Sequence, residues 1–535
     1  MSASNPTESA SRMTPAGRWM ALTAALLGWM FDGAEMGLFS LVGRPAVQDL
    51  LRHSHGADVS EATIGFYFGM IIALFLVGAA TGGVLFGWLG DRIGRVRAMS
   101  LSVVTYAVFT GLCGFATTPL QIAILRFIAS LGMGGEWALG VALVMEVWPN
   151  RSRALMAGLI GAAANVGYFV VAIVGYGLIA VLAQCETALR SIVSADTAAW
   201  LVSNNGWRLL MMLGTTPALL TFFFRLFVPE SEKWQSEQEK GTVSHWATRD
   251  LLGVLIGALG PALIVTVWSL DGTYLGQAVV PVRIVGSLLG LAIATLGYTF
   301  PVVQYLKRQR LAEEAAGRPV EPTGPILRRM LLGAGLAGVA LLGTWGSTQW
   351  APSWANQLVE SIPAESRPKA KELTLMASAM GAIVGTILAA LIGDWLGRRI
   401  TYFLFCAASL GSVLLFFQGN TQFDAKFLAT MFVAGLCTAS FYGWLPLYLP
   451  ELFRTNIRAT GQGFSFNFGR ILAAIGTLQV AALMDLFKSE TGFVVGPVNI
   501  GSGYPAACTV MSAIYFVGAT LIWFAPETKG KPLPE

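Results

Sequence analysis

Charged side chains are scarce in this chain of 535 residues. Only 12% of the residues are Asp, Glu, Lys or Arg, whereas 55% are hydrophobic. A soluble domain carries roughly 25% charged residues, so no aqueous fold could shield this much apolar sequence with so little charge. The composition excludes a soluble globular protein and indicates that a lipid bilayer is the surrounding solvent.

Histidine and cysteine are also rare, and their positions exclude several kinds of site. The three histidines, His53, His55 and His245, lie outside the apolar runs, and the five cysteines include no CxxC pair. Neither a disulfide framework nor a metal site is indicated. Within the runs there is also no Ser/His/Asp or Cys/His cluster and no phosphate-binding loop. We therefore expect no metal, no cofactor and no enzyme activity.

Long apolar runs make up most of what is present. An apolar run of about 20 residues spans a bilayer as a helix, whereas barrel strands would be about ten residues long with alternating polarity. The sequence therefore predicts an all-α multi-pass membrane protein with about 14 transmembrane helices. These runs lie at 19–41, 62–86, 98–116, 120–146, 154–183, 208–228, 250–269, 281–303, 328–350, 372–392, 401–418, 426–448, 461–484 and 504–525.

The ends of the runs and the net charge of +5 indicate topology. The first run is too long for the apolar part of a cleaved signal peptide, so we expect it to remain as the first helix. Most Lys and Arg residues fall in the loops on the side that also holds the N-terminus, which is the positive-inside bias. We expect both termini to be cytoplasmic, the protein to lie in the inner or plasma membrane, and no nucleic-acid partner.

Two charged motifs occur twice, in the same order and at nearly equal separations. The first has the form Gly-Asp-x-x-Gly-Arg and occurs at 90–95 and 393–398. The second has a Glu, an Arg-Ala pair and a Gly with fixed spacing, at Glu146, Arg153, Ala154 and Gly158 and again at Glu451, Arg458, Ala459 and Gly463. This repetition predicts two duplicated helical bundles of the same orientation.

The repeats divide the chain into three parts. We predict an N-terminal six-helix bundle at 1–228, a central segment with two extra transmembrane helices at 229–327, and a C-terminal six-helix bundle with a short cytoplasmic tail at 328–535. The alternative for the central pair is a re-entrant or surface-lying hairpin, because Pro261 and Pro281 interrupt it.

These motifs also carry a family resemblance. The stretch "GWLGDRIGRVR" at 87–97 resembles the signature loop of the major facilitator superfamily, although Val96 replaces its usual second basic residue. The stretches "FDGAEMG", "RFIASLGMGGEW", "MEVWPNRSRA" and "GDWLGRR" together resemble the sialate:proton symporter family. "VPESEKW" and "PETKGKPLP" are similar to stretches of sugar porters. The resemblance implies the two-bundle major facilitator fold and a transport function.

The resemblance also implies that the repeated loops form a cytoplasmic gate. In that superfamily the loop is taken to latch the two halves together, whereas the plainer alternative is an ordinary positively charged loop. We expect Asp91 to pair with Arg95 or to cap the N-terminus of a neighbouring helix, where the helix dipole favours negative charge. Glu146 with Arg153, and Glu451 with Arg458, would be companion pairs. The expected gate residues are Gly87, Asp91, Arg92, Gly94, Arg95, Glu146, Arg153, Asp394, Gly397, Arg398, Glu451 and Arg458.

Four charges lie deep in predicted spans, where charges are costly and usually functional. By helical rise, Asp32 and Arg126 lie at matching depths, and the resemblance implies that they form the proton-coupling pair. A fixed structural salt bridge is the alternative. Glu35 is a second proton carrier or an outer-mouth residue, and Glu136 is an inner gate or a helix-end anchor.

Candidate substrate contacts are hydroxyl, amide and aromatic side chains within the spans. For each of them alone, an interhelical hydrogen bond is favoured over a ligand contact, and Arg470 is either an anion contact or a cation that extends to the membrane surface. The candidates are Asn165, Tyr168, Thr348, Gln349, Tyr442, Gln462 and Asn467.

The sequence thus predicts a monomeric secondary transporter in which the bundles rock around a midplane site. Its partners would be the bilayer, protons and a small solute: a sugar, a sugar acid such as sialate, or another organic acid. The alternatives are a 14-helix drug:proton antiporter, a passive facilitator, and a membrane receptor or sensor descended from a transporter. Drug export is disfavoured because the fifth run lacks proline.

Overall fold

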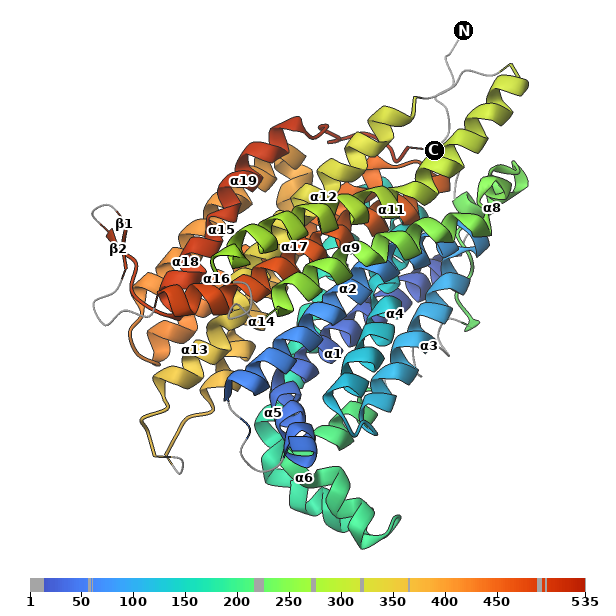
Figure 1. Cartoon of the computed structure of the whole chain (residues 1–535). Helices are drawn as coiled ribbons and strands as arrows, with labels where there is room; N and C mark the ends of the chain where they lie inside the picture. The colour runs from blue at the N-terminus through green and yellow to red at the C-terminus, as the bar shows by residue number, and fades with distance from the viewer. Residues whose placement is uncertain are drawn as a thin grey trace.

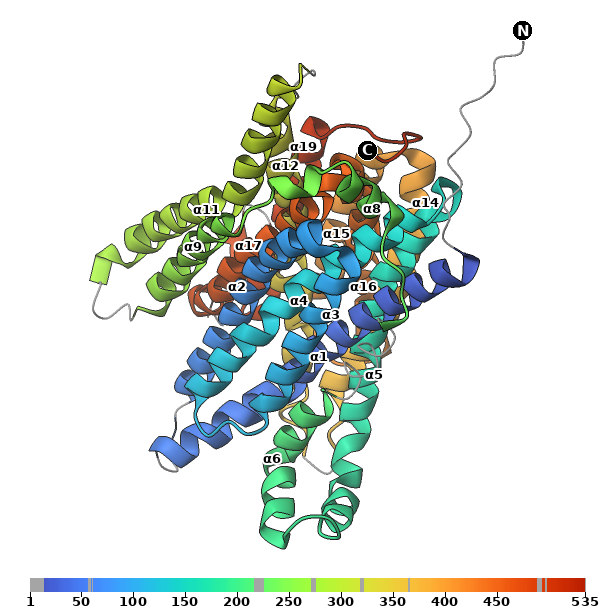
Figure 2. The ribbon, with the colours of Figure 1, turned by 90° about the vertical axis from the view of Figure 1, so that its right-hand side faces the viewer.

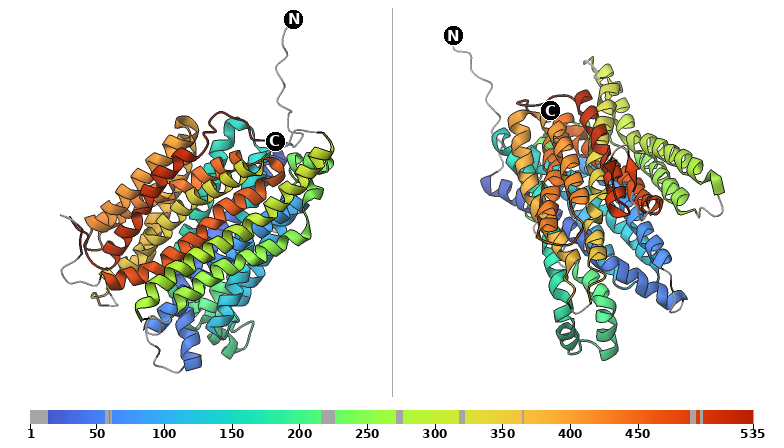
Figure 3. Two further views of the ribbon diagram at one scale, coloured as in Figure 1. Left: turned by 45° about the horizontal axis from the view of Figure 1, so that its top comes forward. Right: turned by 90° about the vertical axis from the view of Figure 1, so that its left-hand side faces the viewer.

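The chain folds into long helices that run roughly side by side (Figures 1 and 3). The structure, a computed structural model, describes residues 14–55, 59, 61–215, 226–270, 276–317, 322–363, 366–487, 493–495 and 498–534. The helices of the first part and the central segment are α1 (Pro15–His55), α2 (Glu61–Ile93), α3 (Arg95–Cys113), α4 (Pro119–Val147), α5 (Asn150–Leu189), α6 (Ala195–Leu213), α8 (Glu232–Glu239), α9 (Leu251–Ser269) and α11 (Val279–Ala315).

The remaining helices belong to the second half of the chain. They are α12 (Thr323–Gly346), α13 (Ala351–Leu358), α14 (Ala370–Leu396), α15 (Arg398–Gly419), α16 (Ala425–Tyr448), α17 (Arg458–Leu486), α18 (Tyr504–Ser512) and α19 (Ile514–Leu521). A short antiparallel hairpin of β1 (Val494–Val495) and β2 (Val498–Asn499) precedes α18.

The number of membrane spans differs from the sequence prediction. Among the described residues, 11 helices are long and apolar enough to cross a membrane, or 12 if the bent helix α1 counts as one span. The predicted count of 14 is therefore not confirmed. The predicted run at 208–228 includes residues 216–225, which lie outside the described part of the chain.

The two central helices α9 and α11 are both among these candidate spans. They pack against each other along glycine-rich faces, and α9 also contacts α2 and α17, so the pair lies on one flank of the molecule (Figure 2). The Tyr298 hydroxyl of α11 is 2.7 Å from the Thr81 hydroxyl of α2. Pro281 does not break α11 because it lies in the first turn, where its backbone nitrogen needs no partner.

Two extended helix contacts join the first half of the chain to the second half: α2 with α17, and α5 with α14. Small residues allow the backbones to approach closely. A Cβ added at Gly463 of α17 would lie 2.3 Å from the carbonyl oxygen of Gly83 in α2. A Cβ added at Gly158 of α5 would lie 3.0 Å from the Cα of Ile387 in α14. The repeated glycine of the second motif therefore serves both contacts between the halves.

Gly463→Ala should destabilise the protein by about 1–3 kcal/mol, because the added methyl group overlaps backbone and forces the helices apart. The melting temperature of the purified protein and the rate of solute uptake should both fall. Gly411→Ala in α15 is the matched control, since no heavy atom lies within 4 Å of that Cβ position. Equal stability and uptake in the two variants would contradict a required close contact between α2 and α17.

Candidate functional site

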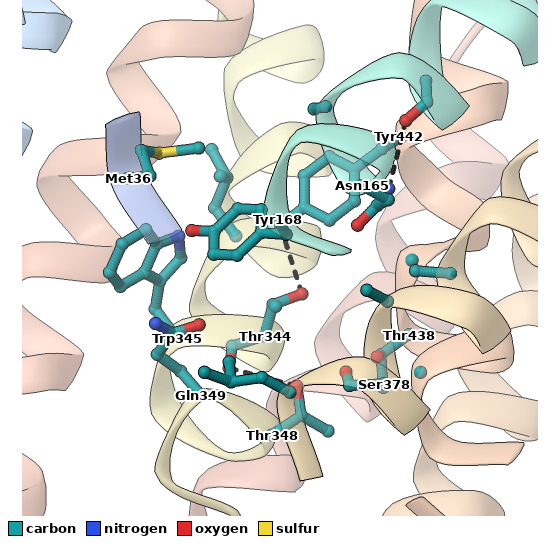
Figure 4. Close-up of a pocket in the computed structure, with 18 of the residues that line it drawn as sticks. Met36, Asn165, Tyr168, Thr344, Trp345, Thr348, Gln349, Ser378, Thr438 and Tyr442 are labelled. Carbon is teal, nitrogen blue, oxygen red and sulfur yellow. Dashed lines mark hydrogen bonds between the residues drawn. The ribbon is translucent and has the colours of Figure 1, made fainter. Parts of the chain in front are cut away.

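A cavity of about 120 Å³ lies between helices of both halves. Figure 4 shows side chains from α1, α5, α12, α14 and α16 gathered around it. Its aromatic and apolar lining includes Trp29, Met36, Trp345 and Phe466. Its polar lining comprises Asn165, Tyr168, Thr344, Thr348, Gln349, Ser378, Thr438, Tyr442 and Arg470. Such a space suits a solute of about one ring, since a cavity of ~150 Å³ admits benzene.

Five of the seven predicted substrate contacts line this cavity: Asn165, Tyr168, Thr348, Gln349 and Tyr442. The Tyr442 hydroxyl is 3.1 Å from that of Thr344, which joins α16 to α12 across one wall. The sequence did not distinguish ligand contacts from interhelical hydrogen bonds. Tyr442 both lines the cavity and forms an interhelical hydrogen bond.

The other two predicted contacts, Gln462 and Asn467, do not line the cavity. Both are fully buried in α17. The Gln462 side-chain amide donates to the carbonyl of Ala138, and that of Asn467 donates to the carbonyl of Gly134 at 3.0 Å. They join α17 to α4, because small residues on α4 leave its backbone carbonyls accessible.

Arg470 is the cationic group in the cavity wall. Its side chain is almost fully buried, and its Nη1 atom has no hydrogen-bond partner among the described residues. The guanidinium lies 5.6 Å from the centre of the Phe466 ring. A buried donor without a partner is costly, so this group is suited to bind an anion that enters the cavity.

Arg126 forms its ion pair with Glu35 rather than with the predicted Asp32. The Arg126 guanidinium also lies between the rings of Phe39 and Phe75, at 4.3 and 4.5 Å. The predicted partner is wrong because Asp32 and Glu35 lie about one turn apart on the same face of α1, and depth estimates do not resolve one turn.

Asp32 and Glu136 are also buried in the helices that the sequence indicated. Asp32 has no exposed surface, and Glu136 in α4 is 2% exposed. Neither carboxylate lines the cavity directly. Asp32 lies between Trp29 and Met36, which do line it, so it belongs to the cavity-facing strip of α1.

At one end of the molecule, Asp91 joins the two halves. Its carboxylate accepts hydrogen bonds from Arg95 at 2.7 Å, from the backbone N–H and hydroxyl of Thr460 at 2.8 and 2.6 Å, and from the backbone of Ala459 at 3.3 Å. Asp91 thus caps the N-terminus of α17, where the helix dipole favours negative charge. A Cβ at Gly87 would lie 2.7 Å from the carbonyl oxygen of Ala459, so glycine is required for this approach.

The two predicted Glu–Arg pairs, one in each half, are replaced by other ion pairs among the described residues. Glu146 binds Arg458 at 2.9 Å and Arg95 at 3.2 Å, whereas Glu451 binds Arg398 at 2.7 Å. Arg153 acts electrostatically on Glu451. The predicted pairs Glu146–Arg153 and Glu451–Arg458 are wrong, because Arg458 at the start of α17 binds Glu146 of the other half and Arg398 binds Glu451.

The aspartate in the second copy of the loop motif is more exposed than the one in the first copy. The Asp394 side chain is 54% exposed and lies 3.6 Å from Arg398. Arg92 of the first copy donates to Thr248, so it contacts the central segment. Gly94 and Gly397 adopt positive φ angles of 109° and 99° at the starts of α3 and α15, where other residues would be strained.

A third repeated element, which the sequence analysis did not assign to the gate, completes the cluster. The Glu230 carboxylate accepts from the backbone N–H groups of Arg95 and Val96 at 2.9 and 3.1 Å. The Glu527 carboxylate does the same for Arg398 and Arg399 at 3.0 and 3.1 Å. This repeat is visible in the sequence as Pro-Glu-Ser at 229–231 and Pro-Glu-Thr at 526–528.

The two capping carboxylates differ in proton affinity. Burial raises the pKa of Glu230 above its ordinary value. Burial also tends to raise the pKa of Glu527, but hydrogen bonds from four backbone N–H groups outweigh this effect and lower the pKa below its ordinary value. The cap of α3 therefore takes up a proton at a higher pH than the cap of α15.

The many apolar helices and the solute-sized cavity between two halves define the class: a multi-pass integral membrane protein of the transport type. The family model of the Major Facilitator Superfamily matches residues 19–477. The chain belongs to this superfamily, and the resemblance predicted from the loop motifs is confirmed.

Individual relatives are transport proteins. The cis,cis-muconate transport protein of Acinetobacter baylyi is 26% identical over 500 residues, covering 93% of this chain and 92% of the relative. The sialic acid transporter NanX of Escherichia coli is 27% identical over 220 residues, or 41% and 46% of the two chains. The proton:xylose symporter XylE shares the fold, with a TM-score of 0.61, 18% identity and coverage of 97% and 98%. The protein is a secondary transporter of small solutes.

Asp91→Asn should reduce uptake by about tenfold or more while the amount of protein in the membrane stays normal. The amide loses the charge at the N-terminus of α17 and turns a donor toward backbone N–H groups, a loss of about 1.5–3 kcal/mol. Asp394→Asn is the matched control. Because this carboxylate is half-exposed, its removal should change uptake by less than about twofold. Equal losses in both variants would show that the cap on α17 is not what the loop contributes.

Proposed function

We propose that this protein carries a small carboxylic acid across the plasma membrane by alternating access, together with a proton. The observation that carries the proposal is Arg470, a buried guanidinium in the cavity wall whose Nη1 atom has no hydrogen-bond partner among the described residues. A guanidinium binds a carboxylate through charge-assisted, often paired hydrogen bonds. A neutral sugar would leave this charge uncompensated in a medium of low dielectric.

The cavity lining supports an organic acid of modest size. Aromatic rings such as Trp29, Tyr168 and Trp345 offer flat apolar surfaces to a ring, and the surrounding hydroxyl and amide groups can fix its orientation. Relatives named as transporters of cis,cis-muconate and sialic acid carry compounds that contain carboxyl groups. We infer an organic acid as the substrate class, with sialate-like sugar acids included in the test.

The proposed movement is a rocking of two six-helix bundles, 1–228 and 328–535, about the cavity, with 229–327 as a central segment. The cluster around Asp91, Glu146 and Arg458 would act as the cytoplasmic gate, since its bonds join the two halves. It would separate when the site opens to that side. Both termini would lie in the cytoplasm, and the transporter would work as a monomer.

Proton coupling is supported by buried carboxylates in α1 and α4. Asp32, Glu35 and Glu136 are all buried, and a carboxylate in the membrane is a natural proton carrier. Arg126 would fix Glu35 through their ion pair. A drug:proton antiporter and a passive facilitator are the alternatives.

The first experiment is uptake by proteoliposomes with and without an imposed inward pH gradient. The panel contains benzoate, cis,cis-muconate, N-acetylneuraminate and xylose, each radiolabelled. We expect accumulation of at least one carboxylate that depends on the gradient, and no accumulation of xylose. Gradient-independent equilibration would identify a passive facilitator, and transport of xylose alone would contradict the proposed substrate class.

Arg470→Gln should weaken binding of the transported acid by about 10- to 100-fold, because a charge-assisted hydrogen bond is lost. Binding to the purified protein measures this effect independently of transport. Arg310→Gln is the matched control, since that arginine is 59% exposed on α11. Unchanged affinity in Arg470→Gln would exclude the guanidinium as the carboxylate contact.

A further inference from the structure

A lysine of the second half extends the cavity wall on the side away from the gate. On α14, the cavity-lining residues Leu375, Ser378 and Ala382 share one face of the helix. Lys371 precedes Leu375 by about one turn and lies on that same face. At 1.5 Å per residue, the helix from Lys371 to the gate residue Arg398 covers about 40 Å. Lys371 therefore lies at the end of the cavity that is remote from the gate.

Arg44 is a cation of the first half at the same end. The helix α1 begins near the gate, where the Trp19 ring lies 5.1 Å from the ring of Trp148 at the end of α4. Met36 of α1 lines the cavity, and Arg44 lies about 12 Å further along the helix by its rise per residue. The Arg44 side chain is exposed, whereas that of Lys371 is partly buried.

Electrostatic contacts bring these two cations together across the end of the cavity. Arg44 and Lys371 are close enough for their charges to act on each other. Arg44 also acts on Tyr504 at the start of α18, and the Tyr504 ring lies 6.1 Å from that of Trp350. Arg44 of the first half therefore faces the second half at this end of the molecule.

The charges in this region do not cancel. Glu372 is next to Lys371 in the chain and acts on its ammonium group. Lys369, at the start of α14, adds a third cation and donates a hydrogen bond to a backbone carbonyl of α5. The next acid along α1, Asp49, binds Arg208. Three cations with one carboxylate therefore give this end of the cavity a positive surplus.

We propose that Arg44 and Lys371 form a second anion site at the outer mouth of the cavity, which binds the carboxylate of an incoming substrate before that substrate reaches Arg470. This inference rests on the proposed function and adds to it a place where the acid is first bound. The two sites lie on one path, because Lys371 continues the face of α14 that lines the cavity.

The physical reason is the repulsion between two like charges, which an anion bound between them offsets. Ammonium and guanidinium groups both recognise a carboxylate through charge-assisted hydrogen bonds. The positive surplus at the mouth also raises the local concentration of anions and speeds their entry. A neutral solute gains from none of these effects, so the outer site selects organic acids over sugars at the point of entry.

The test is uptake of radiolabelled benzoate by right-side-out membrane vesicles that contain the full-length protein, with cis,cis-muconate as the second probe. Lys371→Gln and Arg44→Gln should each raise the KM by about three- to tenfold at an ionic strength of about 10 mM, with the maximal rate changed by less than about twofold. At about 0.5 M the difference from the wild type should nearly vanish, because salt screens exposed charges.

Arg190→Gln is the matched control, because this arginine follows α5 on the same side of the molecule and is 53% exposed. It should keep the wild-type KM at both ionic strengths. Lys371→Arg retains the charge and should also keep that KM, a recovery that a purely structural role of the lysine does not predict.

The proposal is wrong if the neutral variants keep the KM of the wild type and its dependence on salt while Arg470→Gln still weakens binding. If one neutral variant does not fold, the other one decides the test. Failure of the wild type to transport either carboxylate would instead refute the proposed function, so the two failures are distinguishable.

Discussion

A charge inside a bilayer must be compensated by the protein, because lipid offers neither water nor counterions. This constraint organises the interior of the molecule. Arg126 is compensated by Glu35, and Arg208 by Asp49, in both cases with nearly full burial. Arg470 lies in the cavity wall, with Nη1 left without a hydrogen-bond partner among the described residues. The other two arginines are compensated by carboxylates of the protein, whereas the Nη1 donor of Arg470, free among the described residues, supports its proposed role in binding an anion.

The same constraint shapes the gate, where charges are shared between the halves. Glu146 binds Arg95 of its own half and Arg458 of the other, and Asp91 caps a helix of the other half. A network of this kind stabilises one arrangement of the halves, and in the proposed transport cycle it would separate when the site opens on that side. Asp394 is exposed, so the two copies of the duplicated motif do not make equivalent contacts.

The loop motifs, the repeat and the buried charges were readable from the sequence because each leaves a local signal. Charges interrupt apolar runs, and the repeated spacing at 90–95 and 393–398 identifies a duplication. Which acid pairs with Arg126 could not be predicted from the sequence, because Asp32 and Glu35 lie on the same face of α1. The pairing of Glu146 with Arg458 could not be predicted for a related reason, because spacing along the chain says nothing about contacts between the halves.

The sequence by itself determined the solvent, the helical class, the family and five of the polar side chains that line the cavity, because composition and helical periodicity are properties of the chain alone. Only the tertiary structure decided the contacts: Glu35 with Arg126, Glu146 with Arg458, and the ring contact of Trp29 in α1 with Phe466 in α17 beside the cavity. These depend on helix rotation and close packing at glycines such as Gly463, and both are fixed by neighbours that lie far away in sequence.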